Sequence, residues 1–227
     1  MNRDSNSYTI IYASVMVIFA AVLLALASQS LRSFQKENED NDKCQQILRS
    51  INVSAKASEA KAKYNELIKE AFLVNDKGEK VDGDAFDIDV VKAFESKQYP
   101  VFVANVDGKD KFILALYGSG LWGPLWGYIS FEDDKNSVFG ADFSHAGETP
   151  GLGAEISHKF FSNQFIGKKI FQNGEFKSIA VVKPGKEAIG QDYIDGISGG
   201  TITSNALGLM VFDSLSGYVN FLTSKNQ

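Results

Sequence analysis

The stretch YPVFVANVDGKDKFILALYGSGLWGPLWGYISFEDDKNSVFGADFSH, residues 99–145, decides the fold expected for this chain. It contains four runs rich in β-branched and aromatic residues, at positions 99–106, 111–118, 124–132 and 137–145. Short turns that contain Gly, Asp or Asn separate these runs. The pattern predicts an antiparallel meander.

Helical patterns lie on both sides of the meander. Residues 37–72 are charged and rich in alanine, and KASEAKAKYNELIKEAF, residues 56–72, has helical spacing. After the meander we expect a short amphipathic helix at 154–167 and a strand at 176–185. A longer helix is expected from Thr203 to Leu222, with one apolar stripe formed by Leu207, Met210, Val211, Leu215, Val219 and Leu222. Strands and helices are mixed without strict alternation, which indicates the α+β class with the C-terminal helix packed on the sheet.

An apolar segment without charged residues extends from Tyr8 to Ala27. At 1.5 Å per residue it covers about 30 Å, the thickness of the hydrocarbon core of a bilayer. The alternative is a cleaved signal peptide, because residues 25–27 read Ala-Leu-Ala. Apolar regions of signal peptides are usually about 7–15 residues long and follow a basic segment, whereas only Arg3, next to Asp4, precedes this one. The length favours a retained transmembrane helix.

The predicted organisation therefore has three parts. Residues 1–31 hold a single transmembrane helix at about 8–27, residues 32–72 form a helical stalk, and residues 73–227 form the folded domain. Arg32, Lys36 and Lys43 follow the apolar segment and only Arg3 precedes it, so a literal count of basic residues favours a cytoplasmic C-terminal part. Acidic residues follow the segment too, and the charges leave the orientation in the membrane open.

Composition excludes several kinds of site. The chain has 227 residues, a formal net charge of −5, one cysteine and two histidines. One thiol allows no internal disulfide, thiolate metal site or iron–sulfur cluster, and no metal site is expected. The chain lacks a dense block of Lys and Arg, which argues against nucleic acid as a partner. Any redox chemistry therefore requires an organic cofactor.

GSGLWG, residues 118–123, matches the dinucleotide-binding pattern G-x-G-x-x-G. That pattern must open a helix, whereas Pro124 and a strand-like run follow here, so a Gly-rich bend between strands is expected instead. Trp122 and Trp126 beside it are the only tryptophans. Such a residue belongs either to the core or to the wall of a pocket for a planar ligand.

Two further stretches combine glycine with polar residues. ETPGLGAEI, residues 148–156, predicts a tight loop whose backbone allows close approach. DGISGGTITSNALGLM, residues 195–210, places hydroxyls and glycines directly before the last helix. Unpaired amides and the helix dipole at such a start suit a phosphate group. The simpler alternative is that Thr201 or Thr203 only caps the helix.

DGISGGT, residues 195–201, resembles the flavinylation motif D-x-x-[ST]-G-A-[TS] of the FMN-binding domain family. ETPGLG at 148–153 and GSGLW at 118–122 are similar to two further signatures of the family's electron-transport members. The order of apolar helix, stalk, meander and motifs is most similar to C subunits of sodium-translocating NADH:quinone oxidoreductases. G subunits of Rnf-type ferredoxin:NAD complexes are the near alternative, and a membrane-anchored sensory or binding module without covalent flavin is an alternative of another class.

The resemblance implies a covalent FMN. In this family a flavin transferase uses FAD to attach FMN through its phosphate to the last hydroxyl of the motif, which here is Thr201. The motif departs from the family pattern at Gly200, where the family prefers Ala. The residues expected around the phosphate are Ser198, Gly199, Gly200, Thr203 and Ser204. Those expected near the ring or ribityl chain are Trp122, Glu148, Thr149, Leu152 and Gly153, with Lys183 offsetting negative charge.

The resemblance also implies a role and a location. The chain would relay single electrons between the other subunits of a membrane NADH:quinone reductase, to which NADH oxidation, quinone reduction and sodium movement would belong. It would be a single-pass protein of the inner membrane with its flavin domain on the periplasmic side.

Overall fold

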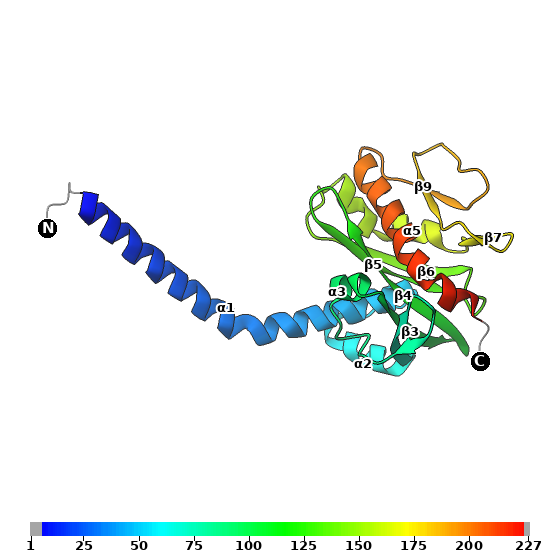
Figure 1. Ribbon diagram of the computed structural model, residues 1–227, viewed down its shortest axis with the longest axis horizontal. Coiled ribbons are helices and arrows are strands. Elements are labelled where there is room, and N and C mark those ends of the chain that lie inside the picture. Colours follow the sequence, from blue (N-terminus) through cyan, green and yellow to red (C-terminus); the bar gives the residue numbers. More distant parts are fainter. Residues whose placement is uncertain (1–5, 225–227) are drawn as a thin grey trace. The chain divides into compact units, whose positions relative to one another are not determined.

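The computed structural model describes residues 6–224, so Arg3 and Asp4 lie outside the described part (Figure 1). The chain forms two compact units, residues 1–42 and 43–227. Its helices are α1 (Asn6–Ser50), α2 (Ala57–Leu67), α3 (Val90–Glu95), η1 (Gly153–Ser157), α4 (Lys159–Ser162), η2 (Asn163–Phe165) and α5 (Thr201–Thr223). Its strands are β1 (Ile68–Asn75), β2 (Lys80–Val81), β3 (Gln98–Val106), β4 (Lys109–Ser119), β5 (Pro124–Phe131), β6 (Val138–His145), β7 (Phe171–Gln172), β8 (Glu175–Phe176), β9 (Ala180–Val182) and β10 (Tyr193–Asp195).

The first unit consists of helix α1 up to Asp42. Among residues 6–224, α1 is the one helix that is long and apolar enough to cross a membrane. Its large apolar side chains, such as Ile18, Phe19 and Leu24, are exposed. The predicted helix at residues 8–27 is confirmed, and it continues without a break to Ser50.

The predicted meander is confirmed as four neighbouring strands of a six-stranded antiparallel sheet with the order β2-β1-β3-β4-β5-β6. The register pairs Val101 with Leu114, Leu114 with Ile129, and Ile129 with Ala141. These four residues are buried on one face of the sheet. Alternation along each strand sends their neighbours to the opposite face.

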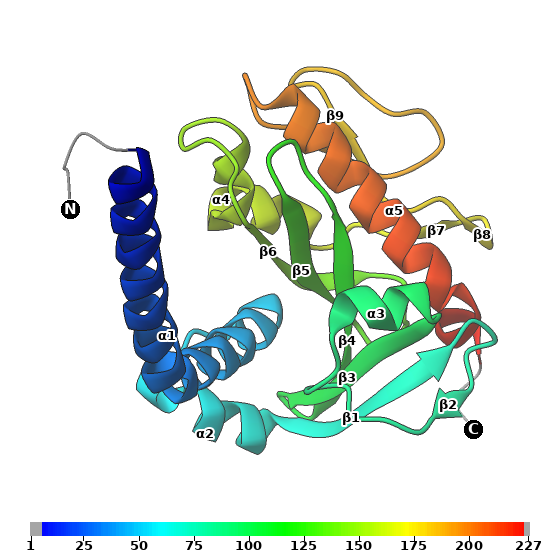
Figure 2. The same cartoon turned by 60° about the vertical axis from the view of Figure 1, so that its left-hand side comes forward.

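The two faces of the sheet carry two apolar cores. Helix α5 covers one face, where Leu114 and Leu116 of β4 are buried (Figure 2). On the other face, Ile113 and Ala115 of the same strand pack with the last turns of α1, including Ile47. Sheet and helices thus form the mixed α and β domain that the sequence predicts.

Helix α5 starts two positions before its predicted start, at Thr201. Its buried stripe includes every predicted member except Val219, which is partly exposed. The Tyr218 hydroxyl donates a hydrogen bond to the carbonyl of Pro100 at 2.8 Å. This bond ties the helix to the sheet beneath it.

The predicted stalk helix at 56–72 is wrong in its last turn. The structure ends α2 at Leu67 and begins strand β1 at Ile68. Phe72 pairs with Val101 of β3, and the next residue, Leu73, is fully buried. Strand pairing and burial override the helical propensity of the local sequence. Because the second unit begins at Lys43, residues 43–72 belong to it, ahead of the predicted domain start at residue 73.

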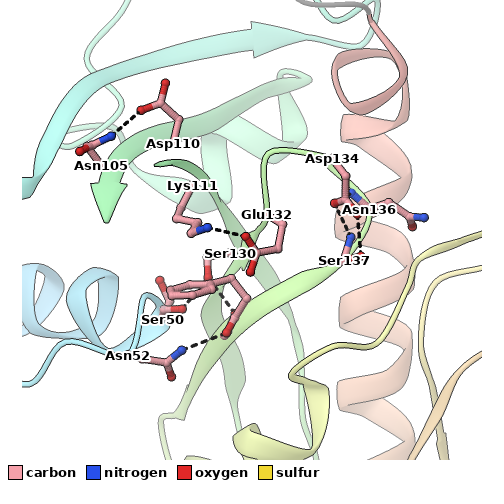
Figure 3. A network of polar contacts seen from close by, with 12 residues as sticks. Ser50, Asn52, Asn105, Asp110, Lys111, Ser130, Glu132, Asp134, Asn136 and Ser137 are labelled. Atoms are coloured by element: carbon pink, nitrogen blue, oxygen red, sulfur yellow. Dashed lines mark hydrogen bonds and ion pairs between the residues drawn. The ribbon is translucent and has the colours of Figure 1, made fainter. Parts of the chain in front are cut away.

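A polar network joins the last turn of α1 to strands β5 and β6 (Figure 3). The Ser130 hydroxyl donates to the carbonyl of Ser50 at 2.6 Å, and the Asn52 amide donates to the carbonyl of Phe139 at 2.9 Å. The Arg49 guanidinium forms two hydrogen bonds of 2.9 Å with the Asp142 carboxylate. The C-terminal end of α1 is therefore a fixed part of the second unit.

The helix predicted at 154–167 is broken into η1, α4 and η2. The break falls at His158, whose backbone is extended with φ −90° and ψ 146°. Phe161 and Phe165, on either side of the next turn, contact Phe143 of β6. Burial of these rings against β6 determines the backbone conformation of this segment. The apolar spacing alone predicts one continuous helix. Of the strand expected at 176–185, Ala180–Val182 forms β9, while Phe176 belongs to the short strand β8.

Candidate functional site

Three loops meet at the end of the sheet where α5 begins, as both views show (Figures 1 and 2). They are the turn between β4 and β5, the loop after β6 and the segment before α5. Together they enclose a pocket of about 290 Å³. Its walls are formed by Leu121, Glu148, Thr149, Leu152, Gly153, Gly199, Gly200, Thr201, Ile202 and Thr203.

The loop after β6 forms a tight turn. The amide of Leu152 donates to the carbonyl of Thr149 at 3.1 Å. Gly151 has φ +75°, a left-handed conformation that glycine adopts without strain. With Pro150 before it, the sequence has the residues that a type II turn requires. The turn places Leu152 and Gly153 in the pocket wall.

The segment before α5 forms a second turn with a similar hydrogen bond. The amide of Gly200 donates to the carbonyl of Ile197 at 3.0 Å, and Gly199 has φ +78°. The first helical bond joins the Ser204 amide to the Gly200 carbonyl at 2.9 Å. In this first turn the amides of residues 201–203 have no carbonyl partner within the helix. Together with the helix dipole, they favour an anionic group at the pocket mouth.

The hydroxyl groups of this segment have different surroundings. Thr201 is exposed and lines the pocket. Thr203 is only 2% exposed, and its hydroxyl donates to Glu148 Oε2 at 2.6 Å. The Ser204 hydroxyl accepts a hydrogen bond from the Ile197 amide at 2.8 Å. The N-cap residue of α5 is Gly200, so the simple alternative in which Thr201 or Thr203 caps the helix is wrong.

Glu148 is the buried charged group of the pocket, with 4% of its surface exposed. Its Oε1 atom accepts a hydrogen bond from the amide of Trp122 at 3.0 Å. Burial raises the pKa of the carboxyl group, but hydrogen bonds from Thr203 and the amides of Trp122 and Leu121 outweigh it and lower this pKa below its usual value. The carboxylate is therefore ionised at neutral pH.

Comparison with known proteins adds an independent finding. The model of the FMN-binding domain family matches residues 120–216, a range that includes all three loops of the pocket. The C subunit of the Na(+)-translocating NADH-quinone reductase from Vibrio anguillarum is 31% identical over an alignment 229 positions long, which covers 91% of this chain and 89% of that protein. The chain belongs to this family of C subunits.

Two solved structures from the same family share the fold. The C subunit of the Na(+)-translocating NADH-quinone reductase from Parabacteroides distasonis is 74% identical, with a TM-score of 0.85 over 86% of this chain and 98% of that chain. NqrC from Shewanella oneidensis is 25% identical, with a TM-score of 0.67 over 81% of this chain and 96% of that one. The α+β fold class is thereby confirmed.

Most of the site residues that the family resemblance suggested lie together in the pocket. They are Glu148, Thr149, Leu152, Gly153, Gly199, Gly200, Thr201 and Thr203. Ser198 and Lys183 are not part of the pocket wall. The indole of Trp122 is also outside it, and this residue is 67% exposed. Trp122 contributes its backbone amide instead.

Leu121 and Ile202 line the pocket but were not among the residues expected from the sequence. A signal for Ile202 exists in the sequence, because this apolar residue of α5 falls outside the predicted apolar stripe. Leu121 lies within GSGLW, one of the stretches similar to a family signature, but its apolar side chain alone gives no sign that it lines a pocket. Only the fold brings that bend against the start of α5.

Gly200 is the position at which the chain departs from the family's flavinylation motif. A Cβ atom here would lie 3.1 Å from Ile197 Cβ and 3.3 Å from the Gly153 amide nitrogen. The backbone φ of −102° suits any residue. An alanine would fit after shifts of a few tenths of an ångström, so Gly200 and the family's Ala are compatible with the same turn.

Proposed function

We propose that this chain is the FMN-carrying, electron-transferring subunit of a membrane-bound, sodium-pumping NADH:quinone oxidoreductase, with FMN joined by a phosphoester bond to Thr201. The observation that carries the proposal is the position of Thr201. It is the first residue of α5, it is exposed, and it lines a pocket within the segment that matches the FMN-binding family.

The residues present fit this cofactor. The unpaired first-turn amides and the dipole of α5 suit a phosphate ester at Thr201. Leu121, Leu152 and Ile202 supply apolar walls for a planar group. Since pockets for whole ligands usually have about 300–1,000 Å³, a pocket of about 290 Å³ suits part of FMN and leaves the rest outside. Ser198, Trp122 and Lys183 are proposed as contacts for that outer part.

Attachment transfers the FMN part of FAD to the Thr201 hydroxyl. Thr201 Oγ1 forms a bond to the FMN phosphorus of FAD while the bond between this phosphorus and the oxygen of AMP breaks. AMP is released and the hydroxyl proton leaves with it, so no electrons are gained or lost. We propose a dedicated flavin transferase as the catalyst of this step.

The bound FMN would supply redox chemistry that accepts and gives single electrons. The chain's own part is to hold it: the bond to Thr201 prevents its loss between redox cycles, and the apolar walls exclude water from one side. NADH oxidation, quinone reduction and sodium movement are assigned to the other subunits, which are the proposed partners.

The test is mass spectrometry of the full chain coexpressed with an active flavin transferase. Trypsin cleavage after Lys186 and Lys225 releases one peptide that contains the start of α5. We expect this peptide to gain the mass of FMN minus water, with fragmentation locating the addition on Thr201. Chain made without the transferase serves as the control. An unmodified peptide beside active transferase, or an addition on another residue, contradicts the proposal.

We further propose that α1 anchors the chain in the inner membrane with the second unit in the periplasm. Alkaline phosphatase fused after Gln227 is then expected to be active, because this enzyme folds only after export. Green fluorescent protein fused at the same position is expected to remain dark in the same cells. Fluorescence together with inactive phosphatase would reverse the proposed orientation.

A further inference from the structure

Glu148 connects the three segments that form the pocket. The residue itself lies in the loop after β6, its Oε1 accepts from the Trp122 amide in the β4–β5 turn, and its Oε2 accepts from the Thr203 hydroxyl in α5. The bonds to Trp122 and Thr203 measure 3.0 Å and 2.6 Å. A carboxylate makes shorter and stronger hydrogen bonds than a neutral acceptor, so these two bonds connect the three segments strongly.

Helical geometry links the direction of Thr203 to that of Thr201. With 3.6 residues per turn, two positions correspond to a rotation of about 200°, so side chains two positions apart leave nearly opposite sides of the helix. Thr203 is held inward by Glu148, where it is buried, and Thr201 is directed to the exposed side of the helix. Any rotation of the first turn that released Thr203 would also move the Thr201 hydroxyl.

Two glycines leave room for this carboxylate. A Cβ atom at Gly153 would overlap Thr203 Oγ1 and Glu148 Oε2, and one at Gly120 would collide with Glu148 Oε1. Each of the two oxygens of Glu148 thus lies against a position at which a side chain would displace it. Gly120 in the β4–β5 turn and Gly153 at the start of η1 therefore leave room for the contact between Glu148 and α5.

We propose that Glu148 is a positioning residue that acts through Thr203 to fix the first turn of α5, so that the Thr201 hydroxyl faces the pocket mouth for flavin attachment. This inference rests on the proposed function. Glu148 itself neither receives the flavin nor exchanges a proton in the transfer. Its effect on attachment therefore requires the hydroxyl of Thr203.

The test measures the initial rate of flavin attachment at saturating FAD, with purified full chain in detergent and purified transferase. Glu148→Ala is expected to slow attachment to Thr201 about tenfold, the factor that corresponds to one hydrogen bond with a charged group. Thr203→Val, which keeps the shape and removes the hydroxyl, is expected to slow it by a similar factor. Glu148→Gln retains an oxygen acceptor and is expected to stay within about threefold of the wild type.

The double variant separates positioning from general stability. If Glu148 acts through Thr203, adding Glu148→Ala to Thr203→Val causes little further loss, whereas independent effects multiply. Glu155→Ala is the matched control, because Glu155 lies in η1 directly after this loop and its carboxylate accepts a hydrogen bond from the Gly151 amide at 3.1 Å. It is expected to load at the wild-type rate.

The outcomes distinguish the two proposals. Two outcomes would overturn the role of Glu148 and leave the proposed function intact. In one, the wild type carries FMN on Thr201 and Glu148→Ala loads equally fast. In the other, the effects of the two single substitutions multiply in the double variant. Wild type without flavin on Thr201 would overturn the proposed function, and the role of Glu148 with it. Circular dichroism checks that each variant is folded, and if Glu148→Ala is not, Thr203→Val decides, because a wild-type rate in that variant would also overturn the role of Glu148.

Discussion

Replacing Thr201 by alanine is expected to remove covalently bound flavin completely. The substitution deletes the only hydroxyl of the first turn of α5 that is both exposed and in the pocket wall, since Thr203 is buried against Glu148. A phosphoester requires an oxygen nucleophile, and an alanine methyl group offers none. The readout is ultraviolet fluorescence of the denatured chain in a gel, after coexpression with the transferase.

Two controls accompany this variant. Thr201→Ser keeps a hydroxyl at the same place and is expected to retain a fluorescent band. Thr223→Ala makes the same chemical change at the other end of α5 and is expected to give a band of wild-type intensity. A band of undiminished intensity in Thr201→Ala would disprove attachment at this residue.

The sheet was predictable because its signal is local. Strands β3 to β6 follow each other in the chain, pair with their neighbours and alternate between two buried faces, so turn residues and β-branched runs mark each of them. Strand β1 was missed for the opposite reason. Residues 68–72 have helical propensity, and only pairing with β3, about thirty residues later, makes them extended.

The site divides in the same way. The turns around Gly151 and Gly199 and the start of α5 could be predicted from glycine, proline and hydroxyl spacing. The bond between Glu148 and Thr203 could not, because the two residues are 55 positions apart and meet only when α5 packs on the sheet. Trp122 shows the limit of residue type as a guide, since its amide and not its ring contacts the site.

Replacing Phe143 by alanine is expected to cause the largest loss of stability among the variants considered. The ring is 2% exposed and packs against Phe165 and Phe161 with centroid distances of 4.9 Å and 6.1 Å. Removal of a buried phenylalanine ring costs about 3–5 kcal/mol of the free energy of unfolding, because a cavity remains where the ring was. Urea unfolding of the full chain in detergent, followed by tryptophan fluorescence, measures the loss as a lower midpoint with an unchanged slope.

Phe160→Ala is the matched control, because Phe160 is the neighbour of Phe161 in α4 but is 58% exposed. Its expected cost is below about 1 kcal/mol, as for most surface positions. The comparison also bears on the site, since Phe143 lies near the end of β6 just before the loop of Glu148, while Phe161 and Phe165 follow that loop. The three rings hold the two ends of the loop together, so Phe143→Ala is expected to lower flavin attachment at urea concentrations that leave Phe160→Ala fully loaded. Equal unfolding midpoints for the two variants would refute this role of the aromatic cluster.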